Sequence, residues 1–218
     1  MKQGYVKVAA AVPYVKVADC YYNVERISEM VHQADAQGVE IVTFPELSVT
    51  GYTCGDLFLQ PFLLDEANAA LCQLVQDTAD THTLVIVGMP VRVEEKLFNS
   101  AVVFQQGRIL GAIPKTYLPN YREFQEKRWF SPSDVLQYKT VRIGEHTVPI
   151  GRNILFRSGR VGIGIEICED MWTPYTPGTR LSLYGAHIIF NLSASNENAG
   201  KHNYLRSIIS GLSSQGLC

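Results

Sequence analysis

Short apolar runs alternate with amphipathic segments through the first 90 residues of the chain. Residues 6–13, 39–44 and 83–88 are compact apolar runs that suit buried strands. Between them, apolar side chains recur every three or four positions over residues 20–38 and again over residues 65–79, which predicts two amphipathic helices. Because strand, helix and strand follow one another with short connections, we expect the first two strands to pair in parallel.

The pattern changes in the middle of the chain. Residues 90–92, 97–104 and 108–114 read as short strands around the turn Gln106-Gly107, which is typical of antiparallel hairpin structure. The sheet is therefore predicted to be mixed. Residues 115–137 are rich in aromatic side chains but show no sustained period, which predicts an ordered loop of a length that often carries function.

The last third of the chain returns to alternating strands and helices. The predicted elements are strands at 147–156 and 160–167, a helix at 177–184, a strand at 187–192, a polar loop at 193–202 and a helix from about Asn203. The whole pattern predicts α/β layers around buried sheets. Because no closing strand follows the last helix, we expect a truncated fold with an unpaired edge strand or an exposed apolar face near the C-terminus.

Composition indicates one globular domain. The chain has 218 residues, of which 46% are hydrophobic and 18% charged, and a formal net charge of −2. That balance supplies no basic field for a nucleic-acid backbone or an anionic membrane, so both partners are disfavoured. No secretory signal or membrane-spanning run is recognisable, which predicts a cytoplasmic protein. The five cysteines are scattered without a C-x-x-C pair, so neither a disulfide scaffold nor a metal site is expected.

Three residues at predicted strand ends carry complementary chemistry. Cys168 ends one apolar strand, while Glu46 and Lys115 each follow another after a proline. Hydrolysis of an amide by a thiol needs a thiolate, a base that forms it and a cation near the developing oxyanion. Taken singly, each residue has an ordinary alternative, namely a packed thiol, a solvated carboxylate and a surface charge. Together, at strand ends predicted to share one rim, they favour a catalytic site.

Three segments resemble a known family. FPELSVTGY (44–52), PKTYLPNYREFQEKRWF (114–130) and GIEICEDMW (164–172) are similar, in the same order, to the signature stretches of the nitrilase, or carbon-nitrogen hydrolase, superfamily. This resemblance implies a four-layer α-β-β-α sandwich. Within the superfamily, GYTCGDLF (51–58) and NLSASNENAGK (191–201) are similar to the N-terminal glutaminase domain of glutamine-dependent NAD synthetases.

The resemblance also implies roles for individual residues. Cys168 matches the nucleophile, Glu46 the general base and Lys115 the cation that stabilises the oxyanion. Glu123 matches a second acid that orients the lysine and the substrate amide. Residues expected to bind glutamine are Tyr121 and Glu169 at the α-amino end, and Ser195 and Lys201 at the α-carboxylate.

These roles imply hydrolysis of L-glutamine to glutamate and ammonia, without a cofactor or metal in this domain. Residues 1–218 would form the glutaminase domain. In such enzymes a separate synthetase domain, absent from these residues, uses ATP and Mg to amidate deamido-NAD with the ammonia. A homo-oligomer is also expected, since members of the superfamily commonly associate.

Two alternatives stay open from the sequence. The first is a free-standing nitrilase-family amidase that acts on another small amide with the same three residues. The second is a non-catalytic, nitrilase-like interaction domain, because a fold does not fix a function. The intact set of Glu46, Lys115 and Cys168 argues against the second alternative.

Overall fold

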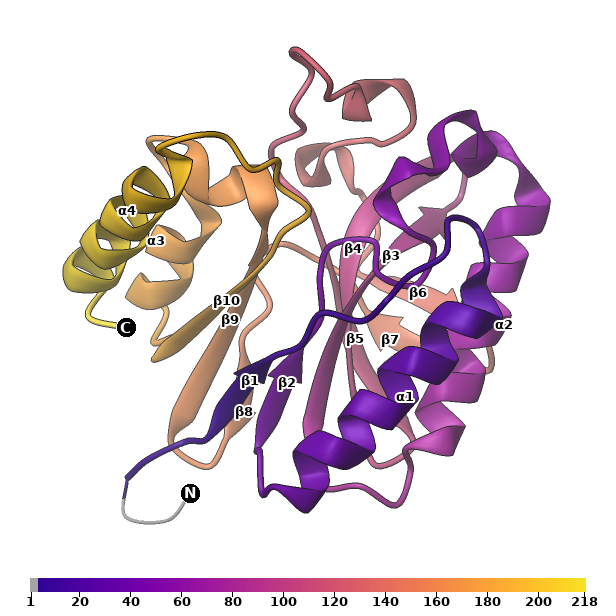
Figure 1. Cartoon of the computed structure of the whole chain (residues 1–218), viewed down its shortest axis with the longest axis horizontal. Helices are drawn as coiled ribbons and strands as arrows, with labels where there is room; N and C mark the ends of the chain where they lie inside the picture. Colours follow the sequence, from indigo (N-terminus) through magenta and orange to yellow (C-terminus); the bar gives the residue numbers. More distant parts are fainter. Residues whose placement is uncertain (1–3) are drawn as a thin grey trace.

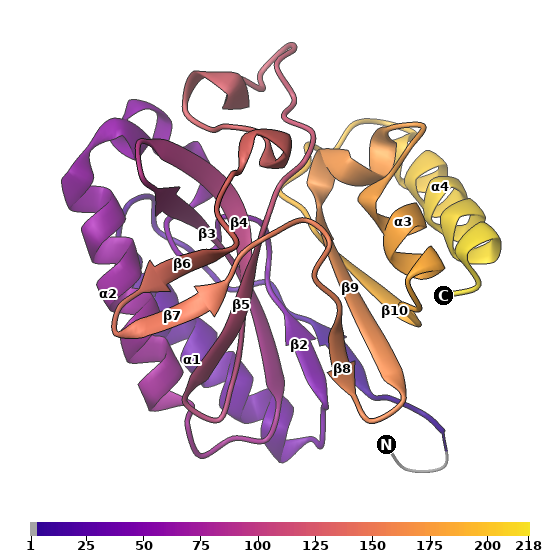
Figure 2. The same cartoon turned by 180° about the vertical axis from the view of Figure 1, so that it is seen from behind.

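The computed structural model describes residues 4–218, which form four layers: two helices, a five-stranded sheet, a three-stranded sheet and two further helices (Figures 1 and 2). This arrangement confirms the expected α-β-β-α sandwich with mixed sheets. The outer layers are α1 (Cys20–Ala36) with α2 (Pro61–Asp77), and α3 (Pro177–Leu183) with α4 (Lys201–Gly216).

The larger sheet holds its strands in sequence order. Its strands are β1 (Val8–Ala10), β2 (Ile41–Thr43), β3 (Leu84–Val93), β4 (Lys96–Gln105) and β5 (Arg108–Pro114). The first three strands are parallel, as predicted for the first pair, and β4 runs antiparallel to both β3 and β5. Strand β5 therefore points the same way as β2, so the carboxyl ends of these two strands lie at the same edge of the sheet.

The smaller sheet has the order β10-β9-β8, with β8 (Phe156–Ser158), β9 (Val161–Ile167) and β10 (Ile188–Leu192). Strand β9 is parallel to β10 and antiparallel to β8. Among residues 4–218, β10 is an edge strand, as expected near the C-terminus. Helix α4 buries none of its residues, and Ile209 on it is 50% exposed.

Two apolar cores hold the layers together. The first lies between the helices α1 and α2 and the larger sheet, where the side chains of Ile27 and Leu71 are fully buried. The second lies between the two sheets and includes Ile86, Val103 and Ile165. Because each sheet buries at least one apolar face in this way, the strands read as nearly continuous hydrophobic runs in the sequence.

Strand β3 is longer than predicted, because it continues through Gly88 and Pro90 to its end at Val93. A proline lacks the N–H that a central strand needs. In this sheet, however, β2 pairs only with the first part of β3, over Leu84 to Ile86. Beyond that point β4 is the one strand that pairs with β3 among residues 4–218, so the missing N–H at Pro90 need not leave a gap in the ladder.

The hairpin between β6 (Thr140–Ile143) and β7 (His146–Pro149) was not predicted. The sequence suggested a single strand over residues 147–156, but the chain leaves the β conformation after Pro149 and re-enters it only at β8. The signal was the turn at Gly144, whose φ of 56° favours glycine. The region 115–137 is an ordered loop, as predicted, with two short turns, η2 (Glu126–Arg128) and η3 (Ser133–Val135).

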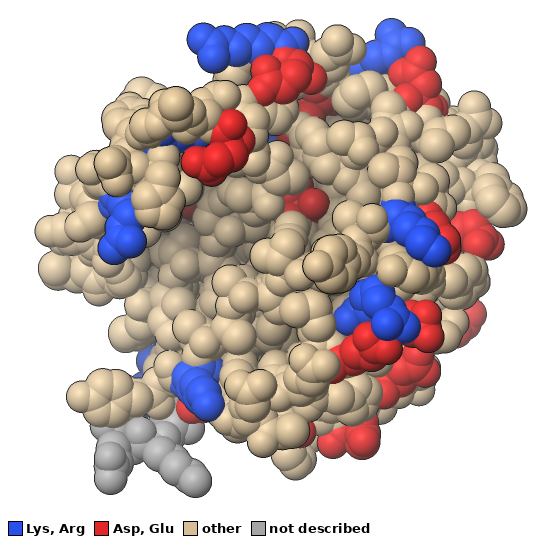
Figure 3. Space-filling view, in the orientation of Figure 1, with Lys and Arg blue, Asp and Glu red and all other residues tan. Residues whose placement is uncertain are grey.

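The surface carries both signs of charge. Figure 3 shows basic and acidic side chains interspersed around the periphery of one face, whose hollowed centre is mostly uncharged. Within residues 4–218, no helix combines the length and the apolar character that crossing a bilayer requires.

We predict that Gly88→Ala destabilises the protein. A Cβ at this position would lie 2.3 Å from the Leu47 backbone nitrogen and 2.7 Å from the Pro45 carbonyl oxygen, so the turn that carries Glu46 would have to move. Overpacking of this kind costs about 1–3 kcal/mol of the free energy of unfolding. Urea unfolding measures it, with Gly211→Ala as the control.

The control position lies in α4, where an added Cβ meets nothing within 4 Å. Gly211→Ala should therefore be neutral or stabilise the protein by about 0.5–1 kcal/mol. Equal unfolding midpoints for Gly88→Ala and the unmodified protein would contradict the close packing of β3 against the Glu46 turn.

Candidate active site

The carboxyl ends of β2, β5 and β9 meet at one end of the sandwich. Glu46 follows β2, Lys115 follows β5 and Cys168 follows β9. The two sheets are joined here by the Ala194 backbone N–H, which donates to Glu46 Oε2 at 3.1 Å. The structure therefore brings together the three residues that the sequence predicted to share one rim.

The Lys115 ammonium is fully buried between two carboxylates. Its Nζ lies 2.6 Å from Glu46 Oε1 and 2.6 Å from Glu126 Oε1. Burial acts to lower the pKa of Lys115, but the two carboxylates outweigh it and raise that pKa above its ordinary value. The lysine is therefore charged at neutral pH. Since an ammonium has three donors, one N–H remains for another acceptor.

Glu126 is the second buried acid of the cluster. Besides Lys115, it accepts a hydrogen bond of 2.8 Å from the hydroxyl of Tyr52. Burial raises the pKa of Glu126, the Lys115 ammonium lowers it and the neighbouring Glu46 raises it further. Two carboxylates share one ammonium here, so the cluster carries an excess of negative charge when both acids are ionised.

The assignment of Glu123 as the acid that orients Lys115 is corrected by the structure, which brings Glu126 to the lysine instead. Glu123 is exposed and accepts a hydrogen bond from the side chain of Asn196. The turn η2 explains the difference. The Phe130 backbone N–H donates to the Glu126 carbonyl at 2.8 Å, and the buried Phe130 side chain anchors this turn so that Glu126 points inward.

Cys168 begins the turn η4 (Cys168–Trp172) with a φ of 45°, in the left-handed region that non-glycine residues rarely adopt. Its side chain is buried. Burial and the negative charge of Glu46 raise the pKa of the Cys168 thiol to about 12, while Lys115 opposes this shift. The resting side chain is therefore a thiol, and a base is needed to form the nucleophilic thiolate.

Asp170 ties the lysine segment to the cysteine segment. One carboxylate oxygen accepts from the backbone N–H groups of Thr116 at 3.0 Å and Tyr117 at 2.8 Å, directly after Lys115. The other accepts from the N–H of Ile167 at 3.0 Å, directly before Cys168. Burial raises the pKa of Asp170 to about 7, although the backbone N–H donors lower it.

The remaining predicted residues lie around a pocket of about 250 Å³ that opens onto Cys168. The Tyr121 hydroxyl donates to Glu169 Oε2 at 2.9 Å, so these two residues meet as a pair. Lys201 donates to the hydroxyl of Ser195 and to the Asn196 carbonyl at 2.8 Å. The pocket is lined by Pro119, Tyr121, Arg122, Phe124, Cys168, Glu169, Trp172, Ser195, Asn196, Asn198, Lys201 and Tyr204.

Sequence reasoning missed Glu126, Asp170 and Asn99, all of which are buried. Asn99 donates to Glu46 Oε1 at 2.6 Å. A usable signal existed for Asn99, which interrupts the apolar run of β4, because an amide buried in a central strand must find polar partners. Glu126 gave no such signal, because its loop has no periodicity to show which acid points inward.

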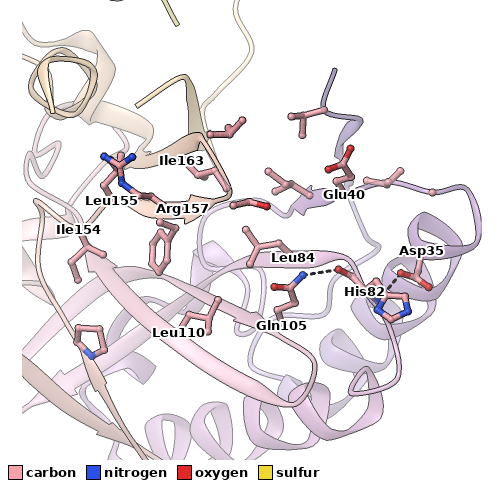
Figure 4. A pocket seen from close by; sticks show the side chains of 18 residues that line it. Asp35, Glu40, His82, Leu84, Gln105, Leu110, Ile154, Leu155, Arg157 and Ile163 are labelled. Carbon is pink, nitrogen blue, oxygen red and sulfur yellow. Dashed lines mark hydrogen bonds between the residues drawn. The ribbon is translucent and has the colours of Figure 1, made fainter. Parts of the chain in front are cut away.

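A larger cavity of about 680 Å³ lies at the opposite ends of the strands (Figure 4). It is lined by Leu84 and Ile163, near the amino ends of β3 and β9, and by Leu110 of β5. Gln105 donates to the His82 carbonyl at its edge, at 2.7 Å. None of the predicted site residues lines this cavity. Among residues 4–218, no group of three or more His, Cys, Asp or Glu side chains is arranged to hold a metal ion.

The structure is thus an α/β protein, an α-β-β-α sandwich with a buried thiol, two carboxylates and an ammonium at its strand ends. The chain belongs to the carbon-nitrogen hydrolase family, whose model matches residues 7–208. The match therefore spans the strands and loops that carry Glu46, Lys115 and Cys168.

Within this family, the chain is similar in sequence to curated glutamine-dependent NAD(+) synthetases. The chain is 37% identical over 203 residues to a glutamine-dependent NAD(+) synthetase of Mycobacterium bovis, covering 92% of this chain and 30% of that protein. It is 32% identical over 190 residues to the human glutamine-dependent NAD(+) synthetase, covering 83% of this chain and 27% of that protein. The chain thus spans about a third or less of the length of these relatives.

Solved structures agree on the fold. A glutamine-dependent NAD(+) synthetase from Cytophaga hutchinsonii superposes with a TM-score of 0.84 at 27% identity, covering 95% of this chain and 34% of that one. An amidase from Nesterenkonia sp. superposes with a TM-score of 0.77, covering 99% of this chain and 74% of that one, but at 15% identity this likeness concerns the fold alone.

We predict opposite effects of two substitutions on the reactivity of Cys168. Glu46 raises the pKa of this thiol and Lys115 lowers it. Glu46→Gln should therefore increase the thiolate fraction, and Lys115→Met should decrease it. At pH 9, below the thiol pKa of about 12, alkylation of Cys168 by iodoacetamide should be faster in the first variant and slower in the second.

Mass spectrometry of the Cys168 peptide measures these rates, and the partly exposed Cys72 in α2 supplies an internal reference. The Cys72 rate should be the same in all three proteins. Equal Cys168 rates in the two variants would show that Glu46 and Lys115 do not act on the thiol.

Proposed function

We propose that this chain hydrolyses the side-chain amide of L-glutamine, with Cys168 as nucleophile, Glu46 as general base and Lys115 as the oxyanion-stabilising cation. The observation that carries the proposal is the buried contact of Lys115 Nζ with Glu46 and Glu126, at 2.6 Å each, beside the Cys168 thiol. The names of the curated relatives, glutamine-dependent NAD(+) synthetases, support glutamine as the substrate.

The reaction begins with proton transfer from the Cys168 thiol to Glu46. The thiolate attacks the amide carbon, a C–S bond forms and the carbonyl electrons move to the oxygen. The free N–H of Lys115 and the backbone N–H of Glu169 are suited to stabilise that oxyanion. Collapse of the intermediate breaks the C–N bond as Glu46 returns the proton to the departing ammonia.

The second half of the reaction releases glutamate. A water molecule gives a proton to Glu46 and attacks the thioester carbon, and the C–S bond breaks as the thiol is restored. Lys115 keeps its charge in both halves, because its raised pKa leaves it protonated at neutral pH. Only one proton on the protein has to move, between Glu46 and the reacting groups.

Substrate recognition follows from the charges around the pocket. The carboxylate of Glu169, held by the Tyr121 hydroxyl, is suited to the α-ammonium of glutamine. Ser195 and Lys201 supply a hydroxyl and a cation for the α-carboxylate. Because Lys201 already donates to Ser195 and to Asn196, it has to exchange at least one of these acceptors for the substrate.

In a longer protein like the relatives, the ammonia would serve the ATP- and Mg-dependent amidation of deamido-NAD to NAD. The relatives' names and the share of their length that this chain covers, 30% or less for the two described above, support residues 1–218 as the glutaminase part. The synthetase part would be the partner that consumes the ammonia.

We predict that the chain releases equal amounts of glutamate and ammonia from glutamine, and that Cys168→Ala abolishes this turnover. Lys115→Met should lower turnover by about 100- to 1000-fold, as loss of one oxyanion donor does. Lys127→Met, which removes an exposed lysine from the same loop, should leave turnover unchanged. Glutamate and ammonia assays measure the rates, and thermal unfolding verifies that each variant is folded.

The proposal also predicts covalent labelling of the unmodified chain at Cys168 by an electrophilic glutamine analogue. A folded chain that neither releases ammonia nor is labelled at Cys168 would contradict the proposed activity. Turnover of other small amides at a higher kcat/KM than glutamine would instead favour a general amidase.

We further predict that Glu169→Gln raises the KM for glutamine by about 10- to 100-fold, because it removes a charge-assisted hydrogen bond to the α-ammonium. The KM for glutaramate, which lacks the amino group, should change little. The comparison of the two substrates measures the interaction directly. An equal rise in both KM values would show that Glu169 acts on the shape of the pocket and not on the ammonium.

A further inference from the structure

Asn99 lies on β4, in the middle of the cluster formed by Glu46, Glu126 and Lys115. We propose that Asn99 is a positioning residue, whose amide group holds the two carboxylates in place, favours the ionised form of the pair and keeps Glu46 aimed as the base. The inference rests on the proposed amide hydrolysis. It adds a residue that does not line the substrate pocket and acts only through the residues that do the chemistry.

The contacts of Asn99 reach the other three residues of the cluster. Its Nδ2 donates to Glu46 Oε1 at 2.6 Å and lies 3.4 Å from Glu126 Oε2. Its backbone carbonyl accepts a hydrogen bond from the backbone N–H of Lys115 at 2.8 Å. The side chain is buried, with a relative exposure of 1%, so water does not compete for these bonds. One residue thus fixes the acids through its amide and the lysine through its backbone.

A neutral donor suits this position for an electrostatic reason. The titratable and charged groups that face the acid pair are the Lys115 ammonium, the Tyr52 hydroxyl and the Cys168 thiol. Lys115 balances only one of the two negative charges. A donor that bonds to both carboxylates favours their ionised form without adding a charge, whereas a hydrophobic side chain would leave them repelling each other.

The other end of the Asn99 amide shows that stability alone does not explain this residue. Among residues 4–218, its Oδ1 is buried without a hydrogen-bond partner. Opposite Asn99 on β3 stands Pro90, which has no backbone N–H to offer. Reversal of the amide would point the oxygen at Glu46 and Glu126, so the acids fix its orientation. Asn99 thus leaves its side-chain carbonyl without a hydrogen bond while its amide N–H groups donate to both acids. Buried polar groups without a hydrogen-bond partner are uncommon, and functional sites are among the places where they occur.

The test is Asn99→Leu, which keeps the branched shape of the side chain and removes the donors. Loss of a charge-assisted hydrogen bond should move the acid limb of the kcat/KM profile for glutamine upward by about one to two pH units. At a fixed pH below the limb, kcat/KM should fall by about tenfold for each pH unit by which the limb moves. The KM should stay close to its original value. If Asn99→Leu does not fold, Asn99→Ala takes its place.

Ser100→Ala is the matched control, because Ser100 is the next residue of β4 and is buried, and among residues 4–218 its hydroxyl bonds only to the Phe98 carbonyl. Its pH profile should be unchanged. A purely structural role of Asn99 would lower the unfolding temperature and leave the pH profile in place, and that result would overturn the inference.

Infrared titration of the buried carboxyl groups, assigned with Glu46→Gln, separates this inference from the proposed function. In Asn99→Leu the acid pair should take up its proton at higher pH, whether or not the chain turns over glutamine. An unchanged carboxyl titration would overturn the inference even if the unmodified chain hydrolyses glutamine. A chain without glutaminase activity but with a shifted titration would contradict the proposed function alone.

Discussion

The arrangement of this end of the sandwich depends on the burial of one charged group, the Lys115 ammonium. Lys115 is fully inaccessible, and a buried charge persists only if partners of opposite charge surround it. Those partners come from two distant segments, Glu46 after β2 and Glu126 in the loop after β5. Removing either acid would take away one of the two ion pairs that hold the buried ammonium. The parallel direction of β2 and β5 and the inward turn of η2 are therefore conditions for this contact, and the contact in turn fixes the end of the sandwich.

The second sheet is attached to this centre through backbone groups. Asp170 accepts hydrogen bonds from backbone N–H groups of both sheet ends, directly after Lys115 and directly before Cys168. The Ala194 backbone N–H donates to Glu46. These bonds set the place of the thiol relative to the acids more rigidly than side-chain packing alone would. The left-handed backbone of Cys168 is the local strain that this anchoring can sustain, as is common where reactive groups are held in place.

The parts of the site that follow regular structure could be predicted from the sequence, and the parts that depend on loops could not. Glu46, Lys115 and Cys168 each follow an apolar run, so the positions of the strand ends indicated a common rim. Glu123 and Glu126 stand three residues apart in a loop without periodicity, and only the η2 turn decides which of them points inward. The β6–β7 hairpin was not predicted for a similar reason, because its one strong signal in the sequence was the turn glycine Gly144.

The pKa pattern explains why the same cluster can serve both halves of the proposed reaction. The Cys168 thiol has a pKa of about 12, so it does not rest as a thiolate in the manner of a cysteine paired with a cation alone. In the proposed reaction this proton passes to the Glu46 carboxylate as the thiolate attacks the substrate carbonyl. Because the pKa of Lys115 is raised, the lysine keeps its own proton and remains a cation that can stabilise the oxyanion. In the proposed reaction the lysine therefore keeps its proton throughout, and the glutamate transfers one.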